Sequence, residues 1–375
     1  MRSADHLLVP WLDALEADLG PLAVFDAHTH IGANDPDGFK QTRAQLLERL
    51  DAAGSRAVTF PMHEPGGYAD ANDEVLDAVQ GTDGRLVAFC RVDPHRDAAA
   101  EARRCLDAGA RGIKLHPRAE AFALSHPAAR ELAALAHERG VPILIHAGRG
   151  IPALGRDTLT LASEFPDARF ILAHAAISDL SWMHTLLPDH PNVLIDTSWW
   201  NATDLLALFA LVAPGQVLYA SDSPYGSPVQ SVVVTLRCAL EAGVSPEQVR
   251  AVAAGNLETI LETPDLPDLG PAPGPPTRPA DPLLARAADN LVSALARRVV
   301  GHDGDEPVAL ARLCCAVPGD APQAQAAASI LALIERSEAH RALPEDERLP
   351  FSDLHVIATA LSVARTPSVA LPILN

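Results

Sequence analysis

The sequence predicts a (β/α)8 (TIM) barrel followed by a C-terminal all-helical appendage. Short apolar runs typical of strands alternate with helical segments at a spacing of roughly 25 to 30 residues, and there are eight such units. Because strands that alternate with helices pair in parallel, eight units close into a barrel. An open, doubly wound sheet is the main alternative. That fold normally carries a glycine-rich phosphate turn after its first strand, where this chain has His28-Thr29-His30.

The expected strands are apolar runs that end in polar residues or proline. The first, residues 24–30, is apolar and then polar, as expected of a strand that leaves a buried core and enters a site. The remaining strands are expected, in chain order, over 56–60, 86–92 (followed by Asp93-Pro94), 112–117 (closed by a proline), 142–146, 169–174, 193–197 and 217–222.

The expected helices are segments in which apolar residues recur at helical spacing, and glycine ends several of them. An amphipathic helix over 6–19 precedes the first strand. The helices that follow the strands are expected over 42–53 (before Gly54), 70–79, 98–108 (before Gly109), 127–139 (before Gly140), 158–165, 180–187, 202–212, 229–242 and 246–261.

The composition changes after the barrel. Residues 1–262 form the predicted barrel domain, and 263–282 are rich in Pro, Gly, Ala and Asp, which is typical of an extended linker. Residues 283–375 are the predicted helical domain, with helical spacing over 283–299, 307–316, 321–338 and 352–364. Their sequence indicates no chemistry, and a homodimer contact or a packing cap is the expected role.

The overall charge and composition exclude some classes of function. The 375-residue chain has a formal net charge of −19, which argues against a nucleic-acid partner because such proteins present a basic patch. No apolar stretch is long enough to span a membrane, and residues 1–20 do not resemble a signal peptide. The cysteines are odd in number and lack metal-ligand spacing, so a reduced, cytoplasmic protein is expected.

Polar residues at the ends of the predicted strands carry the expected chemistry. In such barrels the active site lies at the carboxyl ends of the strands. Those ends bring the following residues to one rim: His28, His30, Lys114, His116, His146, His174, Asp196 and Asp222. Several imidazoles and a carboxylate that end apolar runs at one rim favour a metal site over isolated structural histidines.

These motifs resemble the amidohydrolase superfamily, specifically its amidohydrolase-2 branch, which includes aminocarboxymuconate-semialdehyde decarboxylase. The resemblance covers about residues 22–262 and is specific because all of its motifs occur in order. They are Asp26-Ala27-His28-Thr29-His30, Gly112-Ile113-Lys114-Leu115-His116-Pro117, Ile145-His146-Ala147-Gly148, Ala173-His174 and Ser221-Asp222-Ser223-Pro224.

The resemblance implies that one divalent metal is held by His28, His30, His146 and Asp222, and that His174 faces the substrate or polarises the attacked group. Three imidazoles and a carboxylate suit Zn²⁺, with Mn²⁺ as the alternative, and leave a position for water. Zinc lowers the pKa of bound water from about 16 to about 7. Asp222 can accept the proton of the attacking water.

Asp26 is expected to face the same interior as His28, one layer deeper. It would serve either as a partner that orients a ligand histidine or as a buried structural hydrogen-bonding group.

Lys114 leaves the number of metals open. In dihydroorotase-like relatives a strand-four lysine in a similar setting is carbamylated and bridges two metals, and His146 and His174 would then hold the second ion. In the branch that this chain resembles, one metal is usual. Lys114 would then contact the substrate or form a structural ion pair, and one metal is the preferred interpretation.

The expected substrate-binding residues are Lys114 and His116 together with side chains in the loops after the strands. Arg118 and Arg149 could each bind a carboxylate through two hydrogen bonds, although solvated surface charge is the alternative for both. Trp199, next to Trp200, could form a wall against an apolar or aromatic substrate.

The sequence therefore predicts a metal-dependent hydrolase that acts on an amide, ester or lactone of a small, carboxylated molecule. The alternative is a nonoxidative decarboxylase, a carbon–carbon lyase built on the same rim. A TatD-type nuclease is disfavoured, because that family places a glutamate where this chain has Lys114 and because the chain is acidic. A barrel without catalytic activity would have to retain all of the ligand types and still be inactive.

Overall fold

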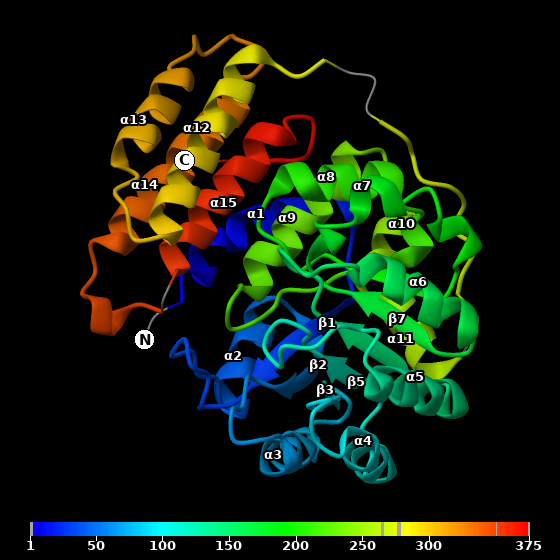
Figure 1. The fold of residues 1–375 in the computed structure, drawn as a ribbon. Coiled ribbons are helices and arrows are strands. Elements are labelled where there is room, and N and C mark those ends of the chain that lie inside the picture. The colour runs from blue at the N-terminus through cyan, green and yellow to red at the C-terminus, as the bar shows by residue number, and fades with distance from the viewer. Residues whose placement is uncertain (1–2, 264–265, 276–278, 350, 374–375) are drawn as a thin grey trace.

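The nine strands found among the described residues form one barrel. The computed structural model describes residues 3–263, 266–275, 279–349 and 351–373 of the chain. Its strands pair in parallel in the order of the sequence (Figure 1). They are β1 (Val24–Ile31), β2 (Ser55–Pro61), β3 (Leu86–Ala88), β4 (Cys90–Arg91), β5 (Ile113–Leu115), β6 (Pro142–Ile145), β7 (Arg169–Leu172), β8 (Val193–Asp196) and β9 (Val217–Leu218).

Backbone hydrogen bonds close the barrel between β1 and β9. The amide of Ala27 donates to the carbonyl of Tyr219 (3.0 Å), and the amide of Asp222 donates to the carbonyl of His28 (2.8 Å). The single strand expected over 86–92 is instead two pieces, β3 and β4. Phe89 separates them, and its amide still donates to Thr59 on β2 (2.9 Å), so the barrel remains continuous there. The predicted barrel is confirmed.

An irregularity in β1 sets which residues face the inside. The register between β1 and β2 shifts between Asp26 and Thr29. Phe25 and Ala27 pack in the interior cluster with side chains of the other strands. Because side chains alternate along a strand, Asp26 lies on the other face, and the bulge returns the following residues to the inside. The expectation that Asp26 shares the interior face with His28 is wrong for this reason.

Helices surround the barrel in the predicted order. They are α2 (Arg43–Ala52), α3 (Ala69–Val79), α4 (Ala98–Asp107), α5 (Pro127–Arg139), α6 (Leu154–Glu164), α7 (Leu180–Met183), α8 (Ala202–Leu211), α9 (Pro228–Glu241), α10 (Pro246–Arg250) and α11 (Asn256–Glu262). Short 3-10 turns cover His174–Ala176, Leu187–Asp189 and Pro214–Gln216. The helix expected over 246–261 is interrupted by a π-helical turn, Ala251–Gly255.

The chain after the barrel forms a separate group of helices. We call α12 (Pro282–Val299), α13 (Asp305–Cys314), α14 (Ala324–Arg341) and α15 (Ser352–Arg365) the tail bundle. A 3-10 turn, Glu345–Glu347, lies between the last two. The segment predicted as a linker runs along the outside of the barrel to α12 (Figure 1). Its residues 264–265 and 276–278 lie outside the described residues, and 266–275 contain no helix or strand.

The tail bundle packs directly on the barrel. Helix α15 lies against α9 and against α1 (Asp5–Leu19), the helix that precedes the first strand (Figure 1). Trp11 on α1 donates its indole N–H to the Ser329 hydroxyl on α14 (2.8 Å). Buried residues of both parts belong to one continuous hydrophobic cluster. The tail bundle therefore shares its core with the barrel.

Arg237 on α9 anchors the end of α15, and we expect its replacement by alanine to destabilise the protein. Its fully buried guanidinium donates to the hydroxyl and the carbonyl of Thr366 (2.9 and 2.7 Å) and to the carbonyl of Ala370 (2.7 Å). Arg237→Ala would leave these acceptors unpaired, so the free energy of unfolding should fall by about 3 kcal/mol in urea denaturation. Arg130→Ala, which breaks an exposed ion pair with Glu164, is the control and should change it little.

The helices and the cysteines agree with the composition. Among the described residues, no helix combines the length and apolarity needed to cross a bilayer. The five cysteines are buried free thiols.

Candidate active site

The site lies at the carboxyl ends of the strands, around the two histidines of β1. His28 and His30 are buried, and their rings lie 5.2 Å apart. Phe60 on β2 packs against both rings, at 5.2 and 4.5 Å between ring centroids. The spacing of the two histidines in the sequence thus correctly predicted that they converge.

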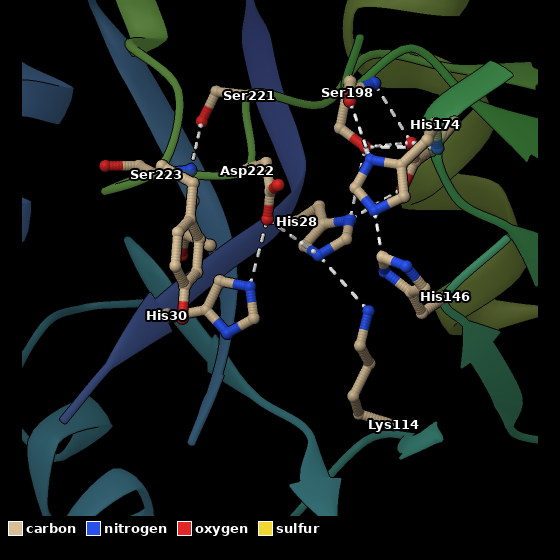
Figure 2. Close-up of polar contacts among 12 residues, drawn as sticks. His28, His30, Lys114, His146, His174, Ser198, Ser221, Asp222 and Ser223 are labelled. Carbon is tan, nitrogen blue, oxygen red and sulfur yellow. Dashed lines mark hydrogen bonds and ion pairs between the residues drawn. The ribbon is translucent and has the colours of Figure 1, made fainter. Parts of the chain in front are cut away.

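Asp222 completes a group of three ligand atoms. Its Oδ1 lies 3.1 Å from Nε2 of His28 and 3.1 Å from Nε2 of His30 (Figure 2). All three atoms lie within 4.8 Å of one another. Metal–ligand distances of about 2.0–2.1 Å at tetrahedral angles place zinc ligands about 3.3 Å apart, close to the spacing seen here. Asp222 has a φ of +61°, a left-handed conformation that is uncommon for residues other than glycine and is often found at functional sites.

The hydrogen bonds around the histidines show that this group fits a cation. The Nδ1–H of His28 donates to Asp196 (2.8 Å), and the Nδ1–H of His30 donates to the carbonyl of Pro61 (3.4 Å). In these tautomers both Nε2 atoms present a lone pair to the Asp222 carboxylate. Burial lowers the pKa of both imidazoles well below the usual value, so neither ring carries a second proton at neutral pH and the contact between these lone pairs and the carboxylate remains. A divalent metal ion would relieve it.

Lys114 lies at the same centre. It is fully buried, and its Nζ is 3.2 Å from Nε2 of His28 and 4.8 Å from the centre of the Phe60 ring (Figure 2). Burial lowers the pKa of Lys114 to about 7. The lysine is thus close enough to the three ligand atoms to take part in the metal site or to contact a substrate bound there.

His146 lies next to the group of three but not in it. His174 donates from Nδ1 to the carbonyl of Ser198 (2.8 Å), so its Nε2 accepts from Nδ1–H of His146 (2.9 Å; Figure 2). Nε2 of His146 is buried, has no hydrogen-bond partner, and packs against Gly148, where a Cβ would come within 2.6 Å. His146 would have to reorient to bind the metal, and its role as a ligand stays a prediction.

The remaining predicted residues line the space above this centre. His116 stacks on His146, with ring centroids 3.8 Å apart, and so supports that ring. Arg118 and Arg149 are exposed, and the Arg149 guanidinium lies 5.4 Å from the centre of the Trp199 ring. The ring centroids of Trp199 and His174 lie 6.2 Å apart.

The structure also assigns roles that the sequence did not reveal. Asp196, a strand-end residue without an assigned role, holds Nδ1 of His28 and the backbone amides of His174 (2.9 Å) and Ser198 (3.0 Å). Its position directly after an apolar run was the only sequence signal.

Asp26 accepts hydrogen bonds from the amides of His28 (3.0 Å) and Ser221 (2.9 Å), and it therefore orients the backbone of the first strand rather than an imidazole ring. Burial raises the pKa of Asp26 to about 7.

Two cavities meet above the centre. We call them the metal lobe and the Trp lobe, of about 310 and 420 Å³. Arg118, His146, Asp222 and Tyr225 line both. His28 and His30 line only the metal lobe, together with the side chains of Arg91 and Lys114. A barrel with two neutral imidazoles and a carboxylate at its mouth, beneath a pocket of this size, belongs to the class of metal-dependent barrel enzymes.

The family follows from the sequence match. Residues 25–261 match the amidohydrolase family, so the chain belongs to this metal-dependent family and is an enzyme. No curated protein matches the chain.

Solved structures share the fold at low sequence identity. The chain is similar to 2,6-dihydroxybenzoate decarboxylase from Rhizobium (TM-score 0.51, 14% identity, 64% of this chain and 98% of that one). It is also similar to 4-oxalomesaconate hydratase from Rhodopseudomonas palustris (0.50, 17%, 64% and 95%). A third is a probable 2-pyrone-4,6-dicarboxylic acid hydrolase from Acinetobacter baumannii (0.50, 13%, 64% and 99%). These three proteins catalyse different kinds of reaction, so the fold alone does not indicate which one this chain catalyses.

Proposed function

We propose that this enzyme hydrolyses an amide, ester or lactone of a small, carboxylated molecule, with the help of one divalent metal ion, most readily zinc. The observation that carries the proposal is the convergence of His28, His30 and Asp222, whose three possible ligand atoms lie within 4.8 Å of one another. His146 is the proposed fourth ligand.

The chain's own groups would position the substrate and transfer protons. A divalent ion held at this centre would act as a Lewis acid and make bound water more acidic. Burial raises the pKa of Asp222 to about 6, so its carboxylate is mostly ionised at neutral pH yet basic enough to accept the proton of an attacking water. Both ring nitrogens of His174 are engaged, Nδ1 by the carbonyl of Ser198 and Nε2 by His146, so Nε2 would become available to the substrate when His146 turns to bind the metal.

The cations around the pocket support a carboxylated substrate. Arg91, Lys114 and Arg118 line the metal lobe, and Arg149 lines the Trp lobe. Arg91 is already paired with the buried carboxylate of Glu120 (2.7 Å), which leaves Lys114, Arg118 and Arg149 as the proposed carboxylate-binding residues. Trp199 would then pack against the body of the substrate.

Metal content per chain tests the proposal. We expect about one equivalent of zinc in protein purified without added metal, as measured by elemental mass spectrometry, and activity that a chelator removes and zinc restores. Among the described residues, one group of three possible ligands occurs, which supports a single ion. About two equivalents would instead support carbamylated Lys114 as a bridging ligand, and no metal with no uptake would refute the proposal.

Nonoxidative decarboxylation is the second candidate, because the cations that would bind the carboxylate of the substrate also lie next to the metal centre. In that reaction the bond to the carboxyl carbon breaks, its electron pair stays on the substrate carbon, a proton is added there and carbon dioxide leaves. Asp222, whose pKa burial raises to about 6, could relay a proton from water to that carbon. Carbon dioxide released from 2,6-dihydroxybenzoate would favour this reaction, and acid released from aryl lactones or esters would favour hydrolysis.

A further inference from the structure

The Trp lobe is not built by the barrel alone. On the barrel side it is lined by Arg149, Trp199, Trp200 and Gln230, and two further lining residues come from the tail bundle. These are Val299, the last residue of α12, and His355, in the first turn of α15. The chain reaches this pocket again more than 35 residues after the end of the family match at residue 261.

Specific contacts hold α15 at the site, and α12 packs against α15. Nε2 of His355 lies 3.4 Å from the backbone carbonyl of Tyr225, in the loop that carries Asp222. The ring of Tyr225 packs edge-on against His30, with centroids 5.2 Å apart.

A second series of ring contacts joins the tail bundle to the same tyrosine. Phe351, directly before α15, stacks on Phe39 with ring centroids 5.9 Å apart, and Phe39 packs on Tyr225 at 4.7 Å. The start of α15 is thus connected to the metal centre through two intervening rings. Together with the buried Arg237 network at the other end of this helix, these contacts fix the tail bundle at the mouth of the barrel.

We propose that the tail bundle is a specificity element of the active site, which closes the Trp lobe with Val299 and His355 so that it accepts an apolar part of the substrate next to the reacting group. This inference rests on the proposed metal-dependent function. It goes beyond the homodimer contact or packing cap that the sequence led us to expect.

The lining of the lobe supports an apolar occupant. Trp199 and Trp200 pack against each other, with ring centroids 5.9 Å apart, and form one wall. Val299 is 56% exposed and lines the lobe, so a ligand bound there would cover its apolar side chain. A volume of 420 Å³ lies within the range typical of small-molecule sites, which are mostly apolar with a few polar groups.

Two hydroxamates of different size can test the proposal on zinc-loaded protein. Acetohydroxamate binds a catalytic metal with almost no side group, whereas 3-phenylpropionohydroxamate adds an apolar part that would enter the Trp lobe. Isothermal titration calorimetry gives both dissociation constants. We expect Val299→Trp, which fills the lobe, to weaken the phenyl compound about tenfold and to leave acetohydroxamate within about twofold.

A milder variant and a matched control complete the design. Val299→Ser should weaken the phenyl compound about threefold, because it removes apolar contact without adding bulk. Leu313→Trp places the same bulk on α13, at a side chain that is 71% exposed and does not line the lobe, and should change neither constant.

The outcomes separate this inference from the proposed function. If acetohydroxamate binds while both Val299 variants bind the phenyl compound as the wild type does, the tail bundle does not shape the site and the inference is wrong. If neither compound binds the wild type, the metal centre itself is refuted, and the inference falls with it.

Discussion

Replacing Asp222 with alanine is expected to abolish both metal binding and turnover. Oδ1 of Asp222 is the atom that both Nε2 atoms approach at 3.1 Å, and it supplies the negative charge of the ligand group. Without it, two neutral imidazoles remain, and they hold a divalent ion far more weakly. Because the Lewis acid and the proton acceptor are lost together, we expect turnover to fall by about three orders of magnitude or more.

The measurements are zinc content, turnover and the circular dichroism spectrum of each variant. Asp189→Ala makes the same change at an exposed carboxylate in the turn before β8, and it should keep wild-type metal content and rate. His28→Ala should reproduce the loss at a second ligand. An Asp222→Ala protein that retains one zinc ion and full turnover would show that the site lies elsewhere.

The barrel could be predicted because its signals are local. Each strand is a short apolar run, and a polar side chain follows it where the strand leaves the core, as at His146 and His174. The position of these ends on one rim then follows from the parallel pairing of the strands, without any knowledge of side-chain contacts. The rim that contains His28, His30 and Asp222 could be predicted for the same reason, whereas their selection as metal ligands, together with His146, came from the family resemblance.

Other features depend on contacts between distant parts of the chain. The bulge after Asp26 lies in the pairing of β1 with β2, and it returns His28 to the inside of the barrel while Asp26 lies on the other face. The orientation of His146 depends on the tautomer that the carbonyl of Ser198 imposes on His174. Strand periodicity contains neither piece of information.

The position of the tail bundle on the barrel was the feature that the sequence predicted least. Its helices were predicted from their spacing, but an amphipathic helix shows only that one face is covered, and not what covers it. The surface that α15 covers is formed by α1 and α9, which lie more than 100 residues earlier in the chain. The exposed valine at the end of α12 likewise becomes informative only when the pocket beside it is known.

The second large effect is expected from Asp196→Asn, which should weaken zinc binding about 10- to 100-fold while the fold is retained. Asp196 is fully buried, and its two oxygens have different partners. Oδ1 accepts hydrogen bonds from the amides of His174 and Ser198 and from the Ser198 hydroxyl. Oδ2 accepts from Nδ1–H of His28.

The side-chain amide of asparagine has only one oxygen, so it can accept hydrogen bonds at only one of the two positions that the oxygens of Asp196 occupy. Three donors fix its oxygen at the position of Oδ1, so its NH2 group takes the position of Oδ2 and faces Nδ1 of His28. That nitrogen must then accept, which moves the ring proton of His28 to Nε2, where the metal would bind. A carboxylate that sets the tautomer of a histidine in this way acts only through that histidine.

Two measurements distinguish a residue that positions His28 from one that only stabilises the fold. They are zinc affinity, by competition with a chelator of known affinity, and thermal unfolding. Asp196→Asn should lower the affinity and leave the unfolding temperature nearly unchanged, because its backbone hydrogen bonds persist. Asp196→Ala removes those hydrogen bonds as well and should lower both. If Asp196→Asn binds zinc as tightly as the wild type, His28 does not depend on Asp196 for its tautomer, and the lone pairs that face Asp222 require another explanation.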